Sequence, residues 1–415
     1  MLVGKGAFPA VIWALSCFSS LKSRRAAGLY SPGVGRFLKL RMYFVGVVDM
    51  FCKNELRETR VPEIWTNETV DWNSRRLEIA DILQSELFGY RPADPEEISF
   101  EYLPIGDCYV FCGGKVDFLK ILIHTKVNGQ EFSFPMYGAV PKGRKNLPFF
   151  IHISFKSDRP TYQTVHMYEP PFEEIIDNGF AIFWFGYEDV TADNNDFTDG
   201  LAGVLYGGRE RTGSDPGKIA MWSWAASRVM DFCQTLDCLD LTRSAVIGHS
   251  RLGKTALFTG VMDERIQFVI GNGSGFAGAA LSRNYMEERR CSAEFCIRNH
   301  GMWFAENYKK YANREYEMPY DQHFLVVGSA PRHVYVGSAD QDYWATPRLE
   351  FLSAYAAGEV YERLGLPGLV CPDRYPESEE YFHNGYVGYH LRRGMHCLSR
   401  DDWKLYMQYV RNAQV

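Results

Sequence analysis

Short apolar runs and amphipathic segments alternate through the middle of the chain. Each run has the length of a buried strand, and the segments between them place apolar residues at helical spacing. The clearest runs cover residues 147–155, 179–186, 245–247 and 266–270. The clearest helical segment covers residues 219–236, with Ser214 as its expected N-cap. Strands that alternate with helices form a mostly parallel sheet with helices on both faces. The pattern therefore predicts an α/β fold.

The pattern nearer the N-terminus is of a different kind. Residues 72–88 carry apolar side chains at helical spacing and predict an amphipathic helix. Two alternating stretches, 118–126 and 131–140, flank Asn128-Gly129, a dipeptide that favours a two-residue hairpin turn. We expect this antiparallel hairpin at one end of the sheet.

Two later regions and one polar segment complete the pattern. Residues 331–339 predict a late strand, and Ser399 is a natural N-cap for a final helix over 401–410. The segment 187–213 is rich in aspartate, but it lacks the glycine and the terminal glutamate of an EF-hand loop. We therefore expect a solvated surface loop at 187–213.

The segment 245–257 predicts a strand, a tight turn and a helix, with Ser250 at the apex of the turn. Apolar residues lead into Gly248, and helix-forming residues follow the turn. A serine on such a turn is exposed, and the amides of the helix N-terminus face it. The second glycine, Gly253, comes three residues after the serine rather than the usual two. The pattern makes Ser250 a candidate nucleophile and the amide of Arg251 a candidate oxyanion donor.

A serine nucleophile also requires an imidazole and an acid. Asp340 and Asp342 follow the late strand, which keeps the order serine, acid, histidine of the α/β-hydrolases. His390 and His396 both precede the final helix, and strand alternation places His390 in the strand before it. A second oxyanion donor is expected in the turn at 156–158, after the strand that begins at residue 147.

Composition and charge limit the partners. The 415 residues carry a formal net charge of −6, which gives no basic field for nucleic acid. The chemistry needs no cofactor, and the sequence shows no cluster of metal ligands. The ten cysteines include no CxxC pair, and their scatter favours a reducing, cytoplasmic compartment.

Residues 1–55 form a basic extension, and we expect the catalytic domain over residues 56–415. Residues 1–42 contain seven Lys or Arg and no Asp or Glu, with an apolar stretch at 7–18. That stretch is too short to span a bilayer, so no stable membrane insertion is expected. We expect a disordered extension or a weak signal-like segment; in the second case the protein would be secreted.

The motif G-x-S-R-x-G-K at residues 248–254 resembles that of the glucuronoyl esterases, α/β-hydrolases that cleave glucuronic acid esters between xylan and lignin alcohols. The pattern W-x-x-R-R-x-E-I at 72–79 and the segment Pro319–His323 resemble the same family, so the resemblance extends over about residues 60–412. His249 stands where the fungal members of the family carry Cys. Many bacterial members carry His there, so the resemblance is to the bacterial type. The resemblance implies an α/β-hydrolase fold and a carboxylic ester hydrolase that acts on small or oligosaccharide uronate esters, without cofactor or metal.

The resemblance also assigns roles to single residues. It implies a triad of Ser250, Asp342 (two residues before Trp344) and His396, with Asp340 as the second choice of acid. It further implies that the guanidinium of Arg251 assists the oxyanion, that Lys254 contacts sugar hydroxyls, and that the indole of Trp344 packs on the pyranose.

The chain departs from the family pattern at Gly273. Many relatives carry at this position the glutamate that orients the catalytic histidine, and a glycine has no side chain to do so. This departure leaves open a non-catalytic carbohydrate-binding relative. An acetyl-xylan esterase or another carbohydrate esterase with the same triad is a further alternative.

Overall fold

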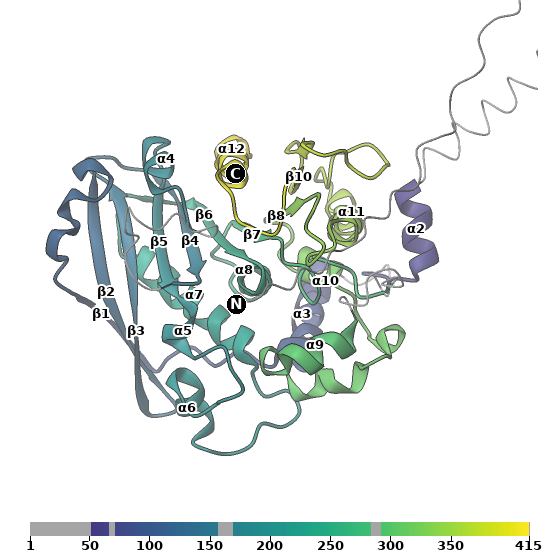
Figure 1. Cartoon of the computed structure of the whole chain (residues 1–415), viewed down its shortest axis with the longest axis horizontal. Coiled ribbons are helices and arrows are strands. Elements are labelled where there is room, and N and C mark those ends of the chain that lie inside the picture. The colour runs from purple at the N-terminus through teal and green to yellow at the C-terminus, as the bar shows by residue number, and fades with distance from the viewer. Residues whose placement is uncertain (1–50, 66–70, 157–168, 284–291, 415) are drawn as a thin grey trace, which may run out of the picture. The chain divides into compact units, whose positions relative to one another are not determined.

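The strands of the computed structural model form one ten-stranded sheet with the order β1-β2-β3-β5-β4-β6-β7-β8-β10-β9 (Figure 1). The structure describes residues 51–65, 71–156, 169–283 and 292–414. The strands are β1 (Glu97–Tyr102), β2 (Val116–Val127), β3 (Gln130–Pro141), β4 (Leu147–Ser154), β5 (Ala181–Gly186), β6 (Leu239–His249), β7 (Phe268–Asn272), β8 (His333–Ala339), β9 (Tyr381–Phe382) and β10 (Val387–Arg392).

Helices connect the strands and belong to the same compact unit, Val48–Val415. None of the described helices is long and apolar enough to cross a bilayer. The α-helices are α2 (Phe51–Thr59), α3 (Trp72–Leu83), α4 (Phe172–Asp177), α5 (Tyr187–Val190), α6 (Gly200–Tyr206), α7 (Lys218–Cys233), α8 (Arg251–Met262), α9 (Ala293–His300), α10 (His323–Val327), α11 (Pro347–Arg363) and α12 (Arg400–Asn412). A π-helical turn, η1 (Gln84–Phe88), extends α3, and short 3₁₀ helices are η2 (Gly106–Gly114), η4 (Gly301–Trp303), η5 (Glu306–Tyr311) and η6 (Glu315–Glu317).

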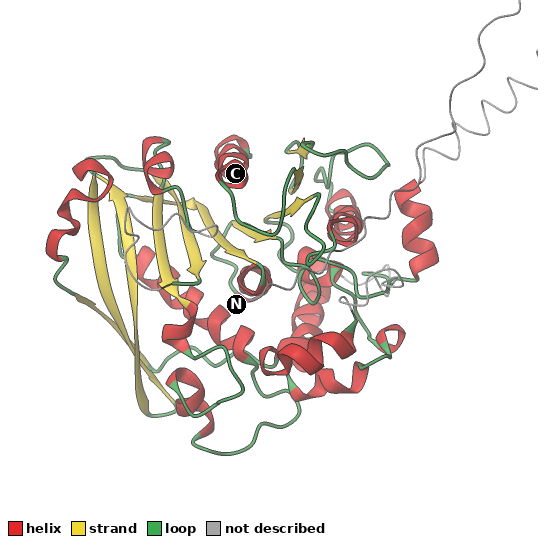
Figure 2. Ribbon diagram, viewed as in Figure 1, coloured by secondary structure: helices red, strands yellow, loops and turns green. Residues whose placement is uncertain are grey.

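The sheet has an antiparallel part and a parallel part, which confirms the predicted arrangement. β1, β2 and β3 pair antiparallel, and Figure 2 shows these long strands at one end of the sheet. Asn128 and Gly129 both have positive φ (51° and 72°), as the type I′ turn requires. From β5 through β4, β6, β7 and β8 to β10 every pairing is parallel.

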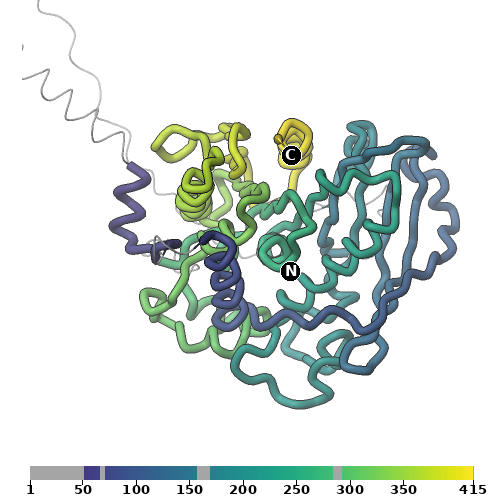
Figure 3. Tube along the Cα trace, turned by 180° about the vertical axis from the view of Figure 1, so that it is seen from behind, coloured from purple at the N-terminus to yellow at the C-terminus, as the bar shows by residue number. Residues whose placement is uncertain are grey.

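Side chains alternate between two apolar cores, one on each face of the sheet. Along β4, Ile151 packs in the core that includes α7 and α8, whereas its neighbour Phe150 contacts Trp403 of α12, with ring centroids 5.2 Å apart. Figure 1 shows α4 and α12 together on one side of the sheet. Figure 3 shows the chain after α3 crossing the back of the molecule towards β1. The central strands are thus buried on both faces, as the continuous apolar runs predict.

Two details differ from the sequence expectation. α7 begins at Lys218 with Gly217 as its N-cap, and Ser214 instead accepts a hydrogen bond from the backbone N–H of Tyr90. The expected solvated loop at 187–213 is also wrong, because the segment contains the helices α5 and α6, whose apolar side chains are buried. One of its aspartates, Asp193, has a side chain that is only 5% exposed and pairs with Arg251. A polar composition therefore did not mean that every aspartate is exposed to water.

The turn between β6 and α8 has the predicted sharp geometry. Ser250 has φ 58° and ψ −124°, a conformation that side chains rarely adopt. The backbone folds so tightly that a Cβ on Gly248 would lie 2.1 Å from the carbonyl oxygen of Leu252. Glycine at position 248 is therefore a steric requirement of the turn.

We predict that Gly248→Ala lowers the free energy of unfolding by on the order of 3 kcal/mol, because the new methyl group displaces the first turn of α8. Urea unfolding followed by circular dichroism measures the change. Gly301→Ala is the matched control: its φ is −55° and a Cβ there meets nothing within 4 Å. Equal stability of the two variants would contradict a steric role for Gly248.

Candidate active site

The carboxyl ends of four neighbouring parallel strands bring the predicted catalytic residues to one edge of the sheet. Ser250 follows β6, Gly273 follows β7, Asp342 lies three residues after β8, and His396 lies four residues after β10. Side chains and loops at such an edge converge, which is where ligands bind in open α/β sheets. Ser250, Gly273 and His396 line one pocket.

Asp342 and His396 form a direct pair. The distance between His396 Nδ1 and Asp342 Oδ2 is 2.6 Å, and Asp342 is only 2% exposed. Its other oxygen, Oδ1, accepts hydrogen bonds from the backbone N–H groups of Trp344 (3.1 Å) and Ala345 (3.0 Å). These bonds fix the carboxylate, and the carboxylate fixes the imidazole ring with Nε2 as the nitrogen available to the nucleophile.

The second-choice residues have different partners. Asp340 accepts hydrogen bonds from Ser378 Oγ (2.7 Å) and from the backbone N–H of Gly394 (2.8 Å). His390 is fully buried in β10, where its Nε2 lies 2.7 Å from Asp402. The geometry therefore favours Asp342 and His396 over these neighbours.

A buried ion pair shapes the loop that carries His396. Arg392 Nε donates to Asp402, while its Nη2 donates to the backbone oxygens of Met395 (2.9 Å) and Cys397 (2.6 Å) on either side of His396. Burial alone would raise the pKa of Asp402, but the bond from His390 and the charge of Arg392 outweigh it and lower that pKa to about 2. The Asp402 carboxylate therefore stays charged and holds the loop through Arg392.

Gly273 gives Asp342 room to reach the histidine. A Cβ at position 273 would lie 3.2 Å from Asp342 Oδ2 and 3.4 Å from His396 Nδ1. Any side chain there would crowd the pair. The small size of Gly273 thus leaves space for the carboxylate of Asp342, which follows the neighbouring strand β8.

A second imidazole packs against that of His396. The ring centroids of His249 and His396 are 4.4 Å apart, and His249 Nδ1 lies 2.6 Å from Asn272 Oδ1. Tyr406 OH accepts from Asn272 Nδ2 at 2.7 Å, so the amide oxygen faces His249. Burial lowers the pKa of His249 well below its ordinary value, and His396 lowers it further. His249 is therefore a neutral neighbour that adds no charge against a protonated His396.

The pocket beside Ser250 has a volume of about 200 Å³ and combines cations with aromatic rings. Lys254 is buried, donates to the Ser274 carbonyl oxygen at 2.6 Å and lies 4.4 Å from the centre of the Phe276 ring. Trp344 is 50% exposed, which excludes a core role. The full lining is Ser250, Arg251, Lys254, Gly273, Ser274, Gly275, Phe276, His300, Trp303, Trp344 and His396.

Three aromatic residues of this pocket carry no functional signal in the sequence: Phe276, His300 and Trp303. The His300 and Trp303 rings stack with centroids 4.0 Å apart and an interplanar angle of 8°. Burial, together with the charges of Lys254 and Arg251, lowers the pKa of His300 to about 4. The ring is thus neutral near pH 7. In a sequence, an aromatic residue that lines a pocket looks the same as one that packs in the core. These three residues are therefore identified only from the fold.

The guanidinium of Arg251 is paired with an acid from the segment 187–213. Arg251 Nη1 forms an ion pair with Asp193, whose side chain is 5% exposed. The guanidinium carbon also lies 5.1 Å from the centre of the Trp303 ring. The predicted second oxyanion turn at 156–158 falls mostly outside the described residues, since the structure describes only Lys156 of it.

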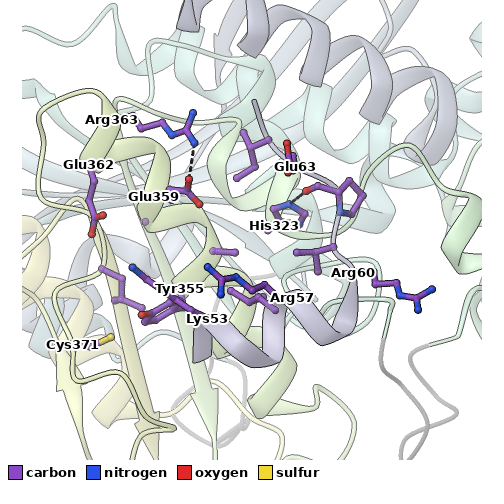
Figure 4. A pocket seen from close by; sticks show the side chains of 17 residues that line it. Lys53, Arg57, Arg60, Glu63, His323, Tyr355, Glu359, Glu362, Arg363 and Cys371 are labelled. Carbon is purple, nitrogen blue, oxygen red and sulfur yellow. Dashed lines mark hydrogen bonds and ion pairs between the residues drawn. The ribbon is translucent and has the colours of Figure 1, made fainter. Parts of the chain in front are cut away.

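A second, larger pocket of about 910 Å³ lies between α2, α11 and the chain that follows α2 (Figure 4). It shares no lining residue with the pocket at Ser250. Its basic residues, such as Arg57 and Arg60, are matched by acids such as Glu362, so its charge favours no ligand class. Across the described part of the chain, no group of three or more His, Cys, Asp or Glu residues is arranged to hold a metal ion.

Glu350 is a buried carboxyl group behind the pocket. One oxygen accepts from Gly275 N (2.8 Å) and Ser274 Oγ (3.1 Å), and the other accepts from Ser338 Oγ (2.7 Å). Glu350 thereby ties the turn after β7 to the end of β8. Burial raises its pKa to about 7, despite these donors.

We predict that Glu350 makes the protein less stable as pH rises from 5 to 8. The folded-state pKa (about 7) exceeds the unfolded value, so the folded state binds the extra proton and this contribution disappears as pH passes through 7. Glu350→Gln cannot titrate. The difference in free energy of unfolding, variant minus native protein, should therefore become more positive by on the order of 1–3 kcal/mol between pH 5 and pH 8. Urea unfolding at several pH values measures this, and parallel pH profiles would refute it.

Comparison with known proteins places this geometry in a family. A family model described as "Glucuronyl esterase, fungi" matches residues 123–365. A carbohydrate esterase from an unknown prokaryotic organism is 36% identical over 243 residues, which cover 57% of this chain and 54% of that protein. A 4-O-methyl-glucuronoyl methylesterase of Wolfiporia cocos is 27% identical over 72% of this chain and 69% of its own length. The match thus spans about half the length of the first of these curated relatives.

Solved structures extend the comparison to most of the chain. A glucuronoyl esterase from Solibacter usitatus superposes with a TM-score of 0.72 and 28% identity, over 85% of this chain and 97% of that one. A promiscuous esterase from a marine bacterial metagenome gives a TM-score of 0.69 and 26% identity, over 85% and 98% of the two chains. The chain therefore belongs to the glucuronyl esterase family of carboxylic ester hydrolases and has their α/β-hydrolase fold.

Proposed function

We propose that this protein hydrolyses carbohydrate esters, and specifically glucuronoyl esters of the xylan–lignin type, through an acyl-enzyme. The observation that carries the proposal is the Asp342–His396 pair beside Ser250, in a pocket whose lining includes two cations and no carboxylate. The family relatives whose names include glucuronoyl methylesterase support the choice of ester.

The geometry supports a two-step mechanism. Ser250 attacks the ester carbonyl while His396 Nε2 takes its proton, and the same nitrogen then delivers the proton to the leaving alcohol. Asp342 holds Nδ1–H and offsets the charge of the imidazolium. A water molecule, activated by His396, then attacks the acyl carbonyl, which releases the uronic acid and regenerates Ser250. The strained backbone at Ser250 presents the hydroxyl in front of the α8 N-terminus.

The oxyanion of the tetrahedral intermediate would lie at the N-terminus of α8. The first amides of a helix have no partner within the helix, so the Arg251 amide suits this role. The nearby guanidinium adds a positive charge on the same side. Electrostatic stabilisation of this kind contributes about 10²–10³-fold per donor in other acyl-transfer enzymes.

The pocket suits a sugar ring more than an acetyl group alone. Trp344 offers a half-exposed indole on which a pyranose face can stack, and the Lys254 ammonium can donate to sugar hydroxyls. The acyl group of a glucuronoyl ester is itself a sugar ring that can contact Trp344 and Lys254, whereas the acyl group of an acetyl ester ends in a methyl group and offers neither contact. We therefore rank acetyl-xylan esterase activity second, and a non-catalytic carbohydrate-binding role third.

We expect faster hydrolysis of a benzyl glucuronate ester than of acetylated xylan or p-nitrophenyl acetate, measured as kcat/KM. A fluorophosphonate should label Ser250 covalently, and Ser250→Ala should abolish the label and the hydrolysis. Labelling with preference for acetylated xylan would overturn the substrate assignment. Absence of labelling in the folded protein would overturn the enzyme assignment.

We expect Asp342→Asn to lower kcat by about 10⁴-fold, because the amide no longer supports the required tautomer or the imidazolium charge. Asp340→Asn is the matched control in the same loop. It should lose less than about 10-fold, since Asp340 bonds Gly394 and Ser378 rather than the catalytic imidazole. Steady-state kinetics on the glucuronate ester would decide between the two acids, and the reverse ranking would make Asp340 the triad acid.

A further inference from the structure

One buried carboxylate next to the active site has no part in the mechanism above. Asp193 lies between α5 and α6 and accepts a hydrogen bond from the indole Nε1 of Trp303 at 2.6 Å. Its other oxygen accepts from Tyr187 OH at 3.2 Å and pairs with Arg251 Nη1. A single carboxylate therefore contacts both the residue after the nucleophile and an aromatic wall of the pocket.

The contacts of Arg251 indicate that Asp193 has a role in catalysis. Asp193 engages only one end of the guanidinium, and Arg251 Nε is buried without a hydrogen-bond partner within the described residues. A buried donor that makes no bond costs free energy unless something else uses it. The Arg251 side chain is still 32% exposed, so without Asp193 it could turn towards solvent. The ion pair thus holds the guanidinium at the pocket that Ser250 also lines.

The indole side of the arrangement positions an aromatic wall of the same pocket. Trp303 stacks on His300 and lies 5.6 Å from the ammonium of Lys254. Because the bond to Asp193 fixes the rotation of the indole, it also fixes the ring that stacks on it. The same carboxylate thereby sets the positions of groups on the carbonyl side and on the sugar side of the pocket.

We propose that Asp193 is a positioning residue, which holds the Arg251 guanidinium for the developing oxyanion and the Trp303 indole for the sugar. The inference rests on the proposed ester hydrolysis. It assigns two separable effects to one residue: the charge acts on turnover through Arg251, and the hydrogen bond acts on sugar binding through Trp303.

Three variants separate these effects. Asp193→Asn keeps an oxygen for the indole N–H and removes the charge, so kcat should fall about 10- to 100-fold, as part of the effect of one oxyanion donor. The fall should be similar for the glucuronate ester and for p-nitrophenyl acetate, with KM for both nearly unchanged. Asp193→Ala should also raise KM for the glucuronate ester. Asp193→Glu restores the charge and should recover kcat above that of Asp193→Asn.

A double-mutant cycle with Arg251→Gln tests the proposed route. If Asp193 acts through Arg251, the double variant Asp193→Asn/Arg251→Gln should be about as slow as Arg251→Gln alone. Asp196→Asn is the control, since Asp196 is an exposed aspartate of the same segment whose carboxylate accepts from Thr198. It should retain native kinetics. Melting temperatures identify variants that have lost the fold.

The rate of Ser250 labelling by a fluorophosphonate provides a readout that does not depend on the natural ester. Asp193→Asn should slow this rate in parallel with kcat, because the phosphoryl oxygen occupies the same oxyanion site. Native labelling and kcat within about 2-fold in folded Asp193→Asn, or multiplicative effects in the cycle, would overturn the inference. Failure of the proposed substrate would instead show as slow glucuronate hydrolysis by the native protein with normal labelling.

Discussion

The active site depends on the parallel alignment of β6, β7, β8 and β10. Because these strands run in one direction, each ends at the same edge of the sheet and delivers one loop there. The serine, the acid and the histidine are 92 and 54 residues apart along the chain, and no local interaction could bring them together. The two apolar cores hold the strands in register, and the register fixes where each loop starts. Strand packing thus determines the relative positions of Ser250, Asp342 and His396.

Buried charged groups then fix the side chains that the strand ends deliver to this edge. The Asp402–Arg392 pair bonds the backbone on either side of His396, and the low pKa of Asp402 keeps that pair charged. A neutral, hydrogen-bonded His249 packs on the His396 ring. The imidazole of His396 is therefore restrained by its loop, by His249 and by Asp342. Truncation of one partner in such a network leaves an unpaired buried charge, which costs more than the bond itself.

Local sequence patterns predicted the parts that local physics determines. The turn at Ser250 requires Gly248 and a following helix, and the hairpin requires Asn128-Gly129; both are visible within a few residues. The resemblance supplied Asp342 and His396, and the structure places these two in contact. Phe276, His300 and Trp303 had no such signal, because they line the pocket only after η4 and the turn after β7 fold against α8. The polar segment 187–213 differs from the prediction for a related reason: Asp193 pairs with Arg251 and Asp199 pairs with the buried Lys218, and composition does not distinguish such pairs from hydrated side chains.

The glycine at position 273 shows how an imidazole can have an acid partner although position 273 has no side chain. The loops after β7 and β8 both reach His396, since the two strands are neighbours and end at the same edge. A Cβ at 273 would lie 3.2 Å from Asp342 Oδ2 and 3.4 Å from His396 Nδ1, so a side chain there would require these groups to shift by a few tenths of an ångström. The absence of a side chain at 273 therefore leaves room for the close approach of Asp342 to the imidazole. His396 has its acid partner at 2.6 Å, and the loop after β8 supplies that acid.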